Sequence, residues 1–371
     1  MFLLLSPAVE YGNRRRCPYI KKELGMPTHK VRFQPVNIEI EVNEDETVLN
    51  AAFRQGVSLT HGCREGQCSA CKSFLLDGDI EMEKYSTFAL PESESEEGYV
   101  LLCRCHAYSD LEVELINYDE DIIRLGIPIE TFHTTIETIE PLTHDIKRLV
   151  LKLVESDRRL KFSAGQYVSI RIPDSEEYRA FSMANTPRTT DRLEFMIKVF
   201  PGGMFSGLLD GAFTIGQELE VMGPYGVFML REKYEDEIIC IGGGSGMAPL
   251  WSLLNDMAER GVKRKATYFY GARTRKDLFY LDHLRQLEER LPGFRFIPAL
   301  SMATEEDEWN GETGLITEVL DRNLAPGQAH TQAYLCGPPP MIDAAIPVLV
   351  RKGISEDRIF FDKFTPTGKV E

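Results

Sequence analysis

Four cysteines follow a spacing that restricts the fold of their segment more than any other feature of the chain. Cys63, Cys68 and Cys71 form the pattern C-x4-C-x2-C, and Cys103 comes much later. This is the ligand spacing of a 2Fe-2S cluster held by four thiolates. Such a loop must turn backbone N–H groups toward negatively charged sulfurs, and Gly66 permits the turn. A zinc site or a set of unrelated thiols is the alternative, but zinc sites usually pair C-x2-C with a second short pair.

The composition describes a folded protein with several domains. With 371 residues, of which 43% are hydrophobic, the chain can bury roughly two or three domain cores. Eight cysteines are too few for a disulfide scaffold in a chain of this length, so we expect a reducing cytoplasm. No apolar run approaches the roughly 18 residues of a membrane-spanning helix, so we expect no membrane association.

Most of the negative charge lies in the segment that carries the cysteines. The formal net charge is -16, and residues 26–121, with 20 acidic and 7 basic side chains, account for -13 of it. Such a surface repels phosphates, so we expect no nucleic-acid partner. It can instead steer a basic protein partner, or simply keep the protein in solution.

The strand and turn patterns divide the chain into a tail and three domains. Residues 1–25 match no recognisable pattern, and we interpret them as an N-terminal tail. The fold class is multidomain: an α+β domain over 26–122, an antiparallel β-barrel over 128–232 and a doubly wound α/β domain over 233–371. The barrel is predicted from short strands between glycine and proline turns, and the last domain from the order strand, glycine loop, helix.

Alternating patterns predict the individual strands and helices of these domains. In the first domain we expect a hairpin over 31–42, a helix over 48–54, a solvated acidic loop over 91–98 and a closing strand over 111–115. The barrel strands are expected over 134–139, 146–153, 167–172, 193–199 and 218–222. In the last domain we expect strands over 237–241, 266–270, 294–299 and 333–336, and a helix over 247–260.

A polar motif follows a predicted barrel strand and has the side chains that a flavin needs. Arg179 can neutralise a pyrophosphate, and Phe181 can cover one face of an isoalloxazine. Ser182 can reach the reactive ring nitrogen. A turn further on offers bare backbone amides to phosphate, and its residues are Gly202, Gly203 and Ser206. Each feature alone is common at strand ends and helix caps, but together and in this order they predict a flavin site.

The last domain has a glycine loop directly after its first buried strand. Its glycines are Gly242, Gly243, Gly244 and Gly246. They allow a sharp turn that brings a helix N-terminus close to a dinucleotide, although the spacing departs from G-x-G-x-x-G. Cys336 and Gly337 follow at a later strand end. The thiol of Cys336 can lie beside a nicotinamide, or it can be a small buried side chain.

With these motifs, residues 28–364 resemble the reductase components of soluble di-iron multicomponent monooxygenases, the methane, propane, butane and phenol/toluene hydroxylase group. The flavin motif of that family, R-x-Y/F-S, matches Arg179, Phe181 and Ser182. The resemblance implies a plant-type ferredoxin domain with the β-grasp fold, fused to a ferredoxin-NADP⁺ reductase-like module. It implies FAD as the flavin and places Phe364 beside the flavin ring. Ser182, Cys336 and Phe364 are then the expected catalytic residues.

The resemblance implies an electron route from NADH to FAD, to the 2Fe-2S cluster and on to a separate hydroxylase component. The reductase of a Rieske-type aromatic-ring dioxygenase is the alternative with the same electron chain. An alternative of another class is a non-redox binding protein that holds zinc in the cysteine loop. The family pattern Leu101-Leu102-Cys103 favours Cys103 as the fourth ligand, although Cys105 competes with it.

Residues in two places bear on how the flavin is contacted and on whether the nucleotide is NADH or NADPH. Phe181 stands where many relatives have tyrosine, so a hydroxyl contact to the flavin is absent while ring packing remains. Arg273 or Arg275 follows the second strand of the last domain, where a reader of the 2′-phosphate of NADPH would lie. The resemblance implies NADH, and basic residues in a surface loop are commonly solvated.

Overall fold

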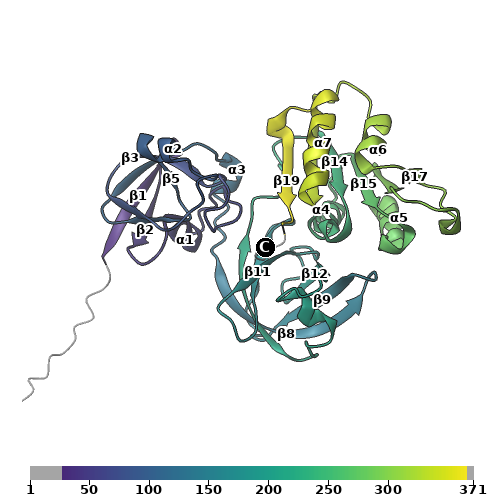
Figure 1. The fold of residues 1–371 in the computed structure, drawn as a ribbon, viewed down its shortest axis with the longest axis horizontal. Helices are drawn as coiled ribbons and strands as arrows, with labels where there is room; N and C mark the ends of the chain where they lie inside the picture. The colour runs from purple at the N-terminus through teal and green to yellow at the C-terminus, as the bar shows by residue number, and fades with distance from the viewer. Residues whose placement is uncertain (1–26, 366–371) are drawn as a thin grey trace, which may run out of the picture.

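The computed structural model describes residues 27–365, whose helices and strands form three lobes (Figure 1). We call residues 27–129 the N-terminal lobe, residues 130–232 the barrel and residues 233–365 the C-terminal lobe. In Figure 1 the N-terminal lobe lies at the left, and the other two lie at the right, one above the other. The predicted tail, residues 1–25, and the last residues, 366–371, lie outside the described residues.

The N-terminal lobe is built on a five-stranded mixed sheet in the order β2-β1-β7-β3-β5. Its strands are β1 Thr28–Gln34, β2 Ile38–Asn43, β3 Lys72–Asp77, β5 Tyr99–Leu101 and β7 Leu111–Leu115, and β4 Ile80–Met82 pairs separately with β6 Cys105–Ala107. The expected hairpin is β1 and β2, and the central pair β1 and β7 is parallel. Alternating burial in β7 follows the alternating sequence and places one face on the core.

Three helices complete the N-terminal lobe: α1 Val48–Arg54, α2 Glu92–Glu97 and α3 Glu120–Ile123. Helix α1 begins where expected, because the side chain of Thr47 accepts a hydrogen bond from the backbone N–H of Asn50. The expected acidic loop over 91–98 is instead helix α2. Pro91 precedes its first turn, and the acidic residues in that turn interact favourably with the helix dipole. Gly98 ends the helix with a φ of 104°.

The barrel is a six-stranded sheet in the order β11-β10-β13-β8-β9-β12, in which every neighbouring pair is antiparallel. Its strands are β8 Glu130–Pro141, β9 Ile146–Leu153, β10 Tyr167–Arg171, β11 Tyr178–Ser182, β12 Arg192–Lys198 and β13 Glu218–Tyr225, with a 3-10 turn, η1, at Ser206–Asp210. Edge strands β11 and β12 contact each other and close the sheet. The flavin motif therefore forms a strand of its own, β11, which the sequence patterns did not predict.

The C-terminal lobe is a doubly wound domain with a six-stranded, entirely parallel sheet in the order β17-β16-β15-β14-β18-β19. Its strands are β14 Glu237–Gly242, β15 Ala266–Ala272, β16 Phe294–Leu300, β17 Glu312–Thr313, β18 Thr331–Gly337 and β19 Ile359–Lys363. Its helices are α4 Met247–Arg260, α5 Leu281–Arg290, α6 Ile316–Asn323 and α7 Pro339–Arg351, with short 3-10 turns η2 Gly244–Gly246, η3 Arg275–Asp277, η4 Glu305–Asp307 and η5 Glu356–Arg358. The strand order reverses between β14 and β18, where such domains bind nucleotides.

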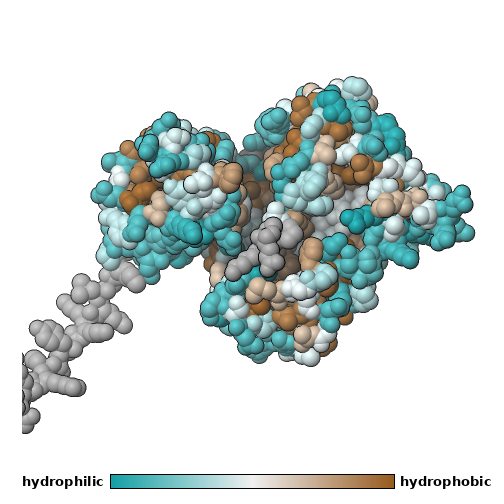
Figure 2. All heavy atoms as spheres, viewed as in Figure 1, coloured by the Kyte–Doolittle hydropathy of each residue, from teal (hydrophilic) through white to brown (hydrophobic). Residues whose placement is uncertain are grey.

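The hydrophobic cores join the three lobes. One core contains buried residues of both the barrel and the C-terminal lobe, and another joins the N-terminal lobe to a single buried barrel residue, Tyr225. Hydrophilic residues cover most of the visible face of the N-terminal lobe (Figure 2). Among residues 27–365, no helix is both long enough and apolar enough to cross a bilayer.

Candidate functional site

The four predicted ligand cysteines form two pairs of thiols, three of them from the loop between α1 and β3 and the fourth, Cys103, from just after β5. Cys63 and Cys68 form one hydrogen-bonded pair, and Cys71 and Cys103 form the other. Within the described part of the chain, no three cysteine sulfurs lie within 4.8 Å of one another. A tetrahedral zinc ion with sulfurs about 2.3 Å away would need all four closer together than this. Two pairs suit two irons, each with two thiolate ligands.

Backbone N–H groups point at these sulfurs from within the loop. Cys63 Sγ lies 3.4 Å from the backbone nitrogen of Glu65 and 3.2 Å from that of Gln67. The hydrogen bond from Cys68, together with these amides, lowers the pKa of the Cys63 thiol. The loop therefore already provides the donors that an anionic cluster requires.

Cys103 and Cys105 differ in their surroundings, which supports Cys103 as the fourth ligand. The hydrogen bond from Cys71, together with the backbone N–H of Gly66, lowers the pKa of Cys103. Cys105 is fully buried on β6, and burial alone raises the pKa of its thiol to about 12. A buried neutral thiol with no donors around its sulfur behaves as a small apolar side chain.

The predicted flavin motif lies along the edge strand β11. The guanidinium of Arg179 donates to Glu177 Oε2 at 2.7 Å and lies 3.4 Å from Met204 Sδ, so it reaches the predicted phosphate turn. Phe181 packs against two aromatic residues of the barrel, with ring centroids 4.9 Å from Phe205 and 6.4 Å from Phe195. The structure thus brings Arg179 and the turn together, while Phe181 packs against the barrel core.

The turn itself has the backbone shape that close approach to an anion needs. The backbone nitrogen of Gly203 donates to the carbonyl of Phe200, and Ser206 Oγ accepts from the nitrogen of Phe200 at 3.1 Å. A Cβ at Gly203 would lie 2.3 Å from that Oγ, so only glycine fits there. Gly202 has a φ of 72° and open space where its Cβ would be. These residues fit a phosphate group of FAD.

The glycine loop after β14 lies at the switch point of the parallel sheet. In the strand register, Gly242 pairs with Cys336. A Cβ at Gly246 would lie 2.3 Å from the carbonyl oxygen of Cys336, so this glycine lets α4 approach β18. At Gly243 a Cβ would lie 2.6 Å from the carbonyl oxygen of Gly271. Gly244 has a φ of 58° and no atom closer than 3.8 Å to its Cβ position, which leaves the space that a dinucleotide needs.

Cys336, Gly337 and Phe364 lie together at the ends of β18 and β19. Cys336 is fully buried, and burial raises the pKa of its thiol well above the usual value, so the sulfur is neutral. The backbone nitrogen of Phe364 donates to the carbonyl of Gly337 at 2.9 Å, and its ring packs against the core shared with the barrel.

Ser182, from the barrel, contacts the end of β19, where its partner is Asp362. Ser182 is 5% exposed, and its Oγ lies 3.5 Å from Asp362 Oδ2. Burial raises the pKa of the half-buried Asp362 carboxyl to about 6. Our sequence patterns assigned no role to Asp362 and no strand to β19. The short apolar run Ile359-Phe360-Phe361 was the available signal, although it does not alternate in polarity.

The two candidate readers of a 2′-phosphate lie in the loop after β15. Both are exposed, and the guanidinium of Arg275 donates to the carbonyl of Asp307 at 2.8 Å. The loop is shaped by Thr274 and Asp277, whose side chains form a capping box.

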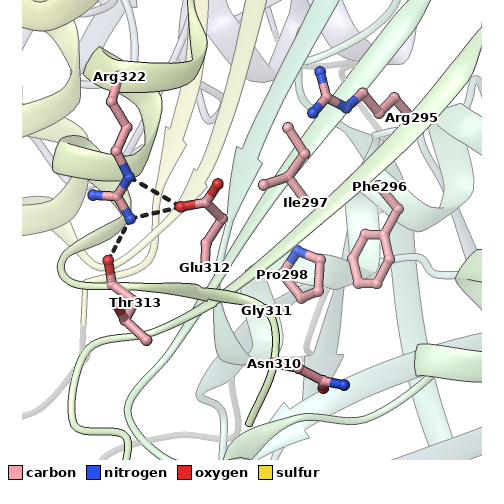
Figure 3. A pocket seen from close by; sticks show the side chains of 9 residues that line it. All are labelled: Arg295, Phe296, Ile297, Pro298, Asn310, Gly311, Glu312, Thr313 and Arg322. Atoms are coloured by element: carbon pink, nitrogen blue, oxygen red, sulfur yellow. Dashed lines mark hydrogen bonds and ion pairs between the residues drawn. The ribbon is translucent and has the colours of Figure 1, made fainter.

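An open pocket of about 600 Å³ lies elsewhere, at the edge formed by β16 and β17 (Figure 3). It contains none of the predicted site residues. Arg322 is already paired there, since it donates to Glu312 Oε2 at 2.7 Å. The pocket therefore has no place in the chemistry described above.

Three family models match the chain in the same order as its lobes. A 2Fe-2S iron-sulfur cluster binding domain matches residues 31–108, an oxidoreductase FAD-binding domain matches 133–230, and an oxidoreductase NAD-binding domain matches 240–346. These matches confirm the expected cofactors and exclude the zinc-binding alternative.

Known proteins resemble the chain over nearly its whole length. It is 50% identical over 341 residues to the reductase component of propane 2-monooxygenase from Mycolicibacterium goodii, which covers 91% of the chain and 97% of that relative. It is 37% identical to the reductase component of phenol 2-monooxygenase from a Pseudomonas species, covering 91% and 94%. The electron transfer component of anthranilate 1,2-dioxygenase from Acinetobacter baylyi is less similar, at 33% identity over 88% of the chain and 93% of that relative.

A solved structure has the same three-lobed architecture. The crystal structure of the Amycolatopsis cytochrome P-450 reductase GcoB superposes with a TM-score of 0.83 at 30% identity, and covers 92% of this chain and all of that one. The greater similarity to monooxygenase components favours the main functional prediction over the dioxygenase alternative. The chain belongs to the family of monooxygenase reductase components, and it is an oxidoreductase that uses a 2Fe-2S cluster, FAD and NAD.

Proposed function

We propose that this chain passes electrons from NADH through FAD and the 2Fe-2S cluster to the hydroxylase component of a soluble di-iron monooxygenase. When bound, FAD accepts electrons in a pair and releases them singly, and the cluster carries one at a time. The observation that carries the proposal is the position of Tyr167. It pairs in register with Ser182 and lies within electrostatic reach of both Asp362 and Cys63. These contacts support a convergence of the three proposed sites at one end of the barrel.

The side chains at this end suggest separate roles. Arg179 and the turn at Gly202, Gly203 and Ser206 would hold flavin phosphates, because they combine a guanidinium with free backbone approach. Ser182 would donate to the reactive flavin nitrogen. Asp362, with a pKa of about 6, would hold a proton beside that hydroxyl. Phe364 would pack against the flavin ring, and Cys336 would line the nicotinamide side from beneath the surface.

The choice of NADH follows from the loop after β15. Both arginines are exposed, but Arg275 is engaged by a backbone carbonyl, which leaves Arg273 as the candidate near the expected ribose. A reader of the 2′-phosphate usually needs a well-placed arginine. We therefore expect steady-state ferricyanide reduction to be at least about tenfold more efficient with NADH than with NADPH. Equal efficiencies would contradict this assignment.

The partner surface that we propose lies beside the cluster loop. The 86–90 loop is bonded to it through Ser86, whose backbone N–H donates to Gly66, and through Ala89, whose carbonyl accepts from Ser69. Phe88, in this loop, is 94% exposed, and the acidic helix α2 follows directly. An exposed aromatic ring with an acidic surround suits a partner with a basic rim and an apolar depression.

A reconstituted assay tests the function as a whole. The purified protein should contain one flavin and two irons per chain, and it should support NADH-driven substrate turnover by a di-iron hydroxylase. A Rieske-type oxygenase is the matched comparison acceptor. Support of the Rieske enzyme alone would overturn the di-iron assignment. A protein that reduces ferricyanide but never its own cluster would overturn the proposed electron route.

The boundaries and location that we propose follow the same evidence. The grouping of strands supports units at 26–122, 128–232 and 233–371. The described cysteines are all free thiols, which supports a reducing cytoplasm.

A further inference from the structure

Arg64 is the residue of the cysteine loop that leaves the N-terminal lobe. It directly follows Cys63 and has a φ of 59°, a left-handed conformation that is unfavourable for a residue with a Cβ. This backbone turn carries the guanidinium away from the sulfurs, and the side chain enters the barrel surface between β10 and β13.

Three barrel side chains receive the guanidinium, and we call them the Arg64 socket: Tyr167, Ser169 and Tyr225. The Nη2 atom of Arg64 donates to Ser169 Oγ at 2.7 Å. The Cζ atom lies 3.8 Å from the ring centroid of Tyr225 and 5.9 Å from that of Tyr167. The two tyrosine rings are stacked, with centroids 5.6 Å apart and planes at 24°. A planar cation over an aromatic face, with a hydrogen bond at its edge, is a specific and directional contact.

The socket lies directly beside the proposed flavin site. Tyr167 pairs with Ser182 of β11 on one side and with Tyr225 of β13 on the other. Its hydroxyl pKa is raised to about 12, mainly by burial, with the charges of Asp362 and Cys63 among the smaller causes. A loop anchored in this socket therefore holds its first ligand cysteine at the flavin end of the barrel.

The other contacts that the N-terminal lobe makes with the socket tyrosines are between aromatic rings, and they do not fix the orientation of the lobe. Phe53 meets the Tyr225 ring edge-on at 5.7 Å, and His61 lies 6.3 Å from the Tyr167 ring. Such contacts tolerate sliding, whereas the hydrogen bond of Arg64 does not. The other directional contact between the two lobes, the pair of Asp119 with Arg231, lies outside the cysteine loop, so Arg64 is the residue that fixes the loop itself.

We propose that Arg64 is a positioning residue for electron transfer between the flavin and the cluster. Seated in the socket, it holds the cluster loop at a fixed distance from the reactive edge of the flavin, without touching either cofactor. In each transfer one electron leaves the reduced flavin and reduces one ferric iron of the cluster to ferrous, and NADH supplies two such electrons. This inference rests on the proposed function, since it concerns one step of that electron route.

The test follows flavin and cluster separately after anaerobic mixing of the full-length protein with NADH. Arg64→Ala and Tyr225→Leu should each slow cluster reduction about tenfold, as expected from loss of a desolvated cation–π contact, and leave flavin reduction at the wild-type rate. The double variant should be no slower than the slower single variant, because both remove the same contact. Arg64→Lys should recover part of the rate, since it retains the charge.

The matched control is Arg32→Ala, an exposed arginine of β1 in the same lobe that pairs with Glu39. It should reduce its cluster at the wild-type rate. Iron content and the electron paramagnetic resonance spectrum of the reduced cluster should stay unchanged in Tyr225→Leu, which separates positioning from damage to the cluster. If Arg64→Ala loses iron, Tyr225→Leu decides, because it lies in another lobe.

Wild-type rates of cluster reduction in Tyr225→Leu, with the cluster intact, would overturn the positioning role. Failure of the wild-type protein itself to reduce its cluster with NADH would instead overturn the proposed function. The slowing should also persist at high salt, because a buried contact is weakly screened, whereas a surface charge effect would disappear.

Discussion

The two junctions of the barrel are built differently. Toward the C-terminal lobe, one hydrophobic core runs through the junction, and the barrel contributes several of its buried residues, which are Ile146, Ala164, Ala184, Met196 and Phe228. Toward the N-terminal lobe, the shared core contains one buried barrel residue, Tyr225, with Tyr167 and Met222 packed at its edge. The first junction resembles the interior of a domain. The second resembles a small interface with two polar anchors, Arg64 in its socket and Asp119 paired with Arg231.

The difference matches what crosses each junction. Transfer between a nicotinamide and a flavin requires two rings in contact, and a continuous core can hold them so. A single electron passes between centres that need not touch, so a smaller junction is sufficient. The Arg64 anchor then sets the distance between flavin and cluster, and it can be altered without disturbing the flavin and nucleotide sites.

The largest expected effect comes from Cys63→Ser, which removes a ligand on the cluster side only. Reduction of cytochrome c with NADH should fall to background, since it requires the cluster, while ferricyanide reduction by the flavin should remain within about twofold of wild type. Both are measured by steady-state absorbance with the flavin content determined in parallel. Joint loss of both activities with the flavin retained would mean that the two junctions are not functionally separate.

A second prediction compares the junctions by stability. Phe228→Ala should lower the free energy of unfolding by about 3 kcal/mol or more, because it opens a cavity in the continuous core. Tyr225→Leu should lower it by only about 1 kcal/mol, since it keeps most of the buried volume. Urea unfolding followed by flavin release measures the first effect, and near-ultraviolet circular dichroism of the whole chain measures both. Equal losses would contradict the contrast between the junctions.

A third prediction concerns the charge at the barrel and C-terminal junction. Burial raises the pKa of Asp362 to about 6 from its usual 3.8. The folded protein therefore keeps a proton that the unfolded chain has lost between these values, and stability falls as pH rises through that range. Asp362→Asn removes the free-energy cost of burying a charged carboxylate at this position.

The variant should be more stable than wild type above about pH 6, by about 2 kcal/mol, and equally stable below about pH 4. It should also lose any inflection near pH 6 in the rate of flavin reduction by NADH. Thermal unfolding across this pH range and stopped-flow kinetics measure the two effects. A retained inflection would assign the titration to another group.

The smallest expected effect is at the outer face of the N-terminal lobe. Phe88→Ala should lower the efficiency of electron delivery to the hydroxylase about fivefold, as expected for loss of one aromatic contact, through a higher KM for that partner. Reduction of the cluster by NADH should be unaffected. Leu76→Ala, another exposed apolar residue of the same lobe, is the control and should change neither quantity. An unchanged KM in Phe88→Ala would place the partner elsewhere.

Much of the fold could be predicted because local patterns and tertiary contacts agree. Helix α4 spans the predicted residues, since the glycine loop before it and Gly261 after it define both ends. Strand β9 also matches, because its apolar run is bounded by turns. Strand β11 was missed: its residues Tyr178–Ser182 do not alternate in polarity, and the strand exists because of its antiparallel pairing with β10.

The candidate site divides in the same way. Spacing along the chain identified the cysteines, because one loop holds three of the four ligands. The partners of Ser182 and Arg64 could not be found in this way. Asp362 lies 180 residues beyond Ser182, and Ser169 lies 105 beyond Arg64. Contacts between lobes leave no periodic signal in a single sequence, so only the folded structure reveals them.

The segment that leads from the N-terminal lobe into the barrel is held by hydrogen bonds and an ion pair along its length. Helix α3 is tied to its own lobe, since the carbonyl of Ile123 accepts from Ser58, and the backbone N–H of Ile129 donates to Phe53 just before β8 begins. At its other end, Asp119 pairs with the buried Arg231 at 2.7 Å. Arg231 also donates through its backbone nitrogen to the hydroxyl of Tyr334 in the C-terminal lobe.

A connection held in this way keeps the two lobes side by side and does not act as a flexible linker. If the Arg64 socket opens, the pair of Asp119 with Arg231 still ties the N-terminal lobe to the barrel, so the lobe stays beside it. In the proposed function, the hydroxylase would then come to this chain and collect its electron from the outward side of the cluster loop. In that arrangement the N-terminal lobe stays in place while it delivers electrons. A flexible insert between the lobe and the barrel would let the lobe move, and the rate of electron transfer from flavin to cluster would then depend on linker length.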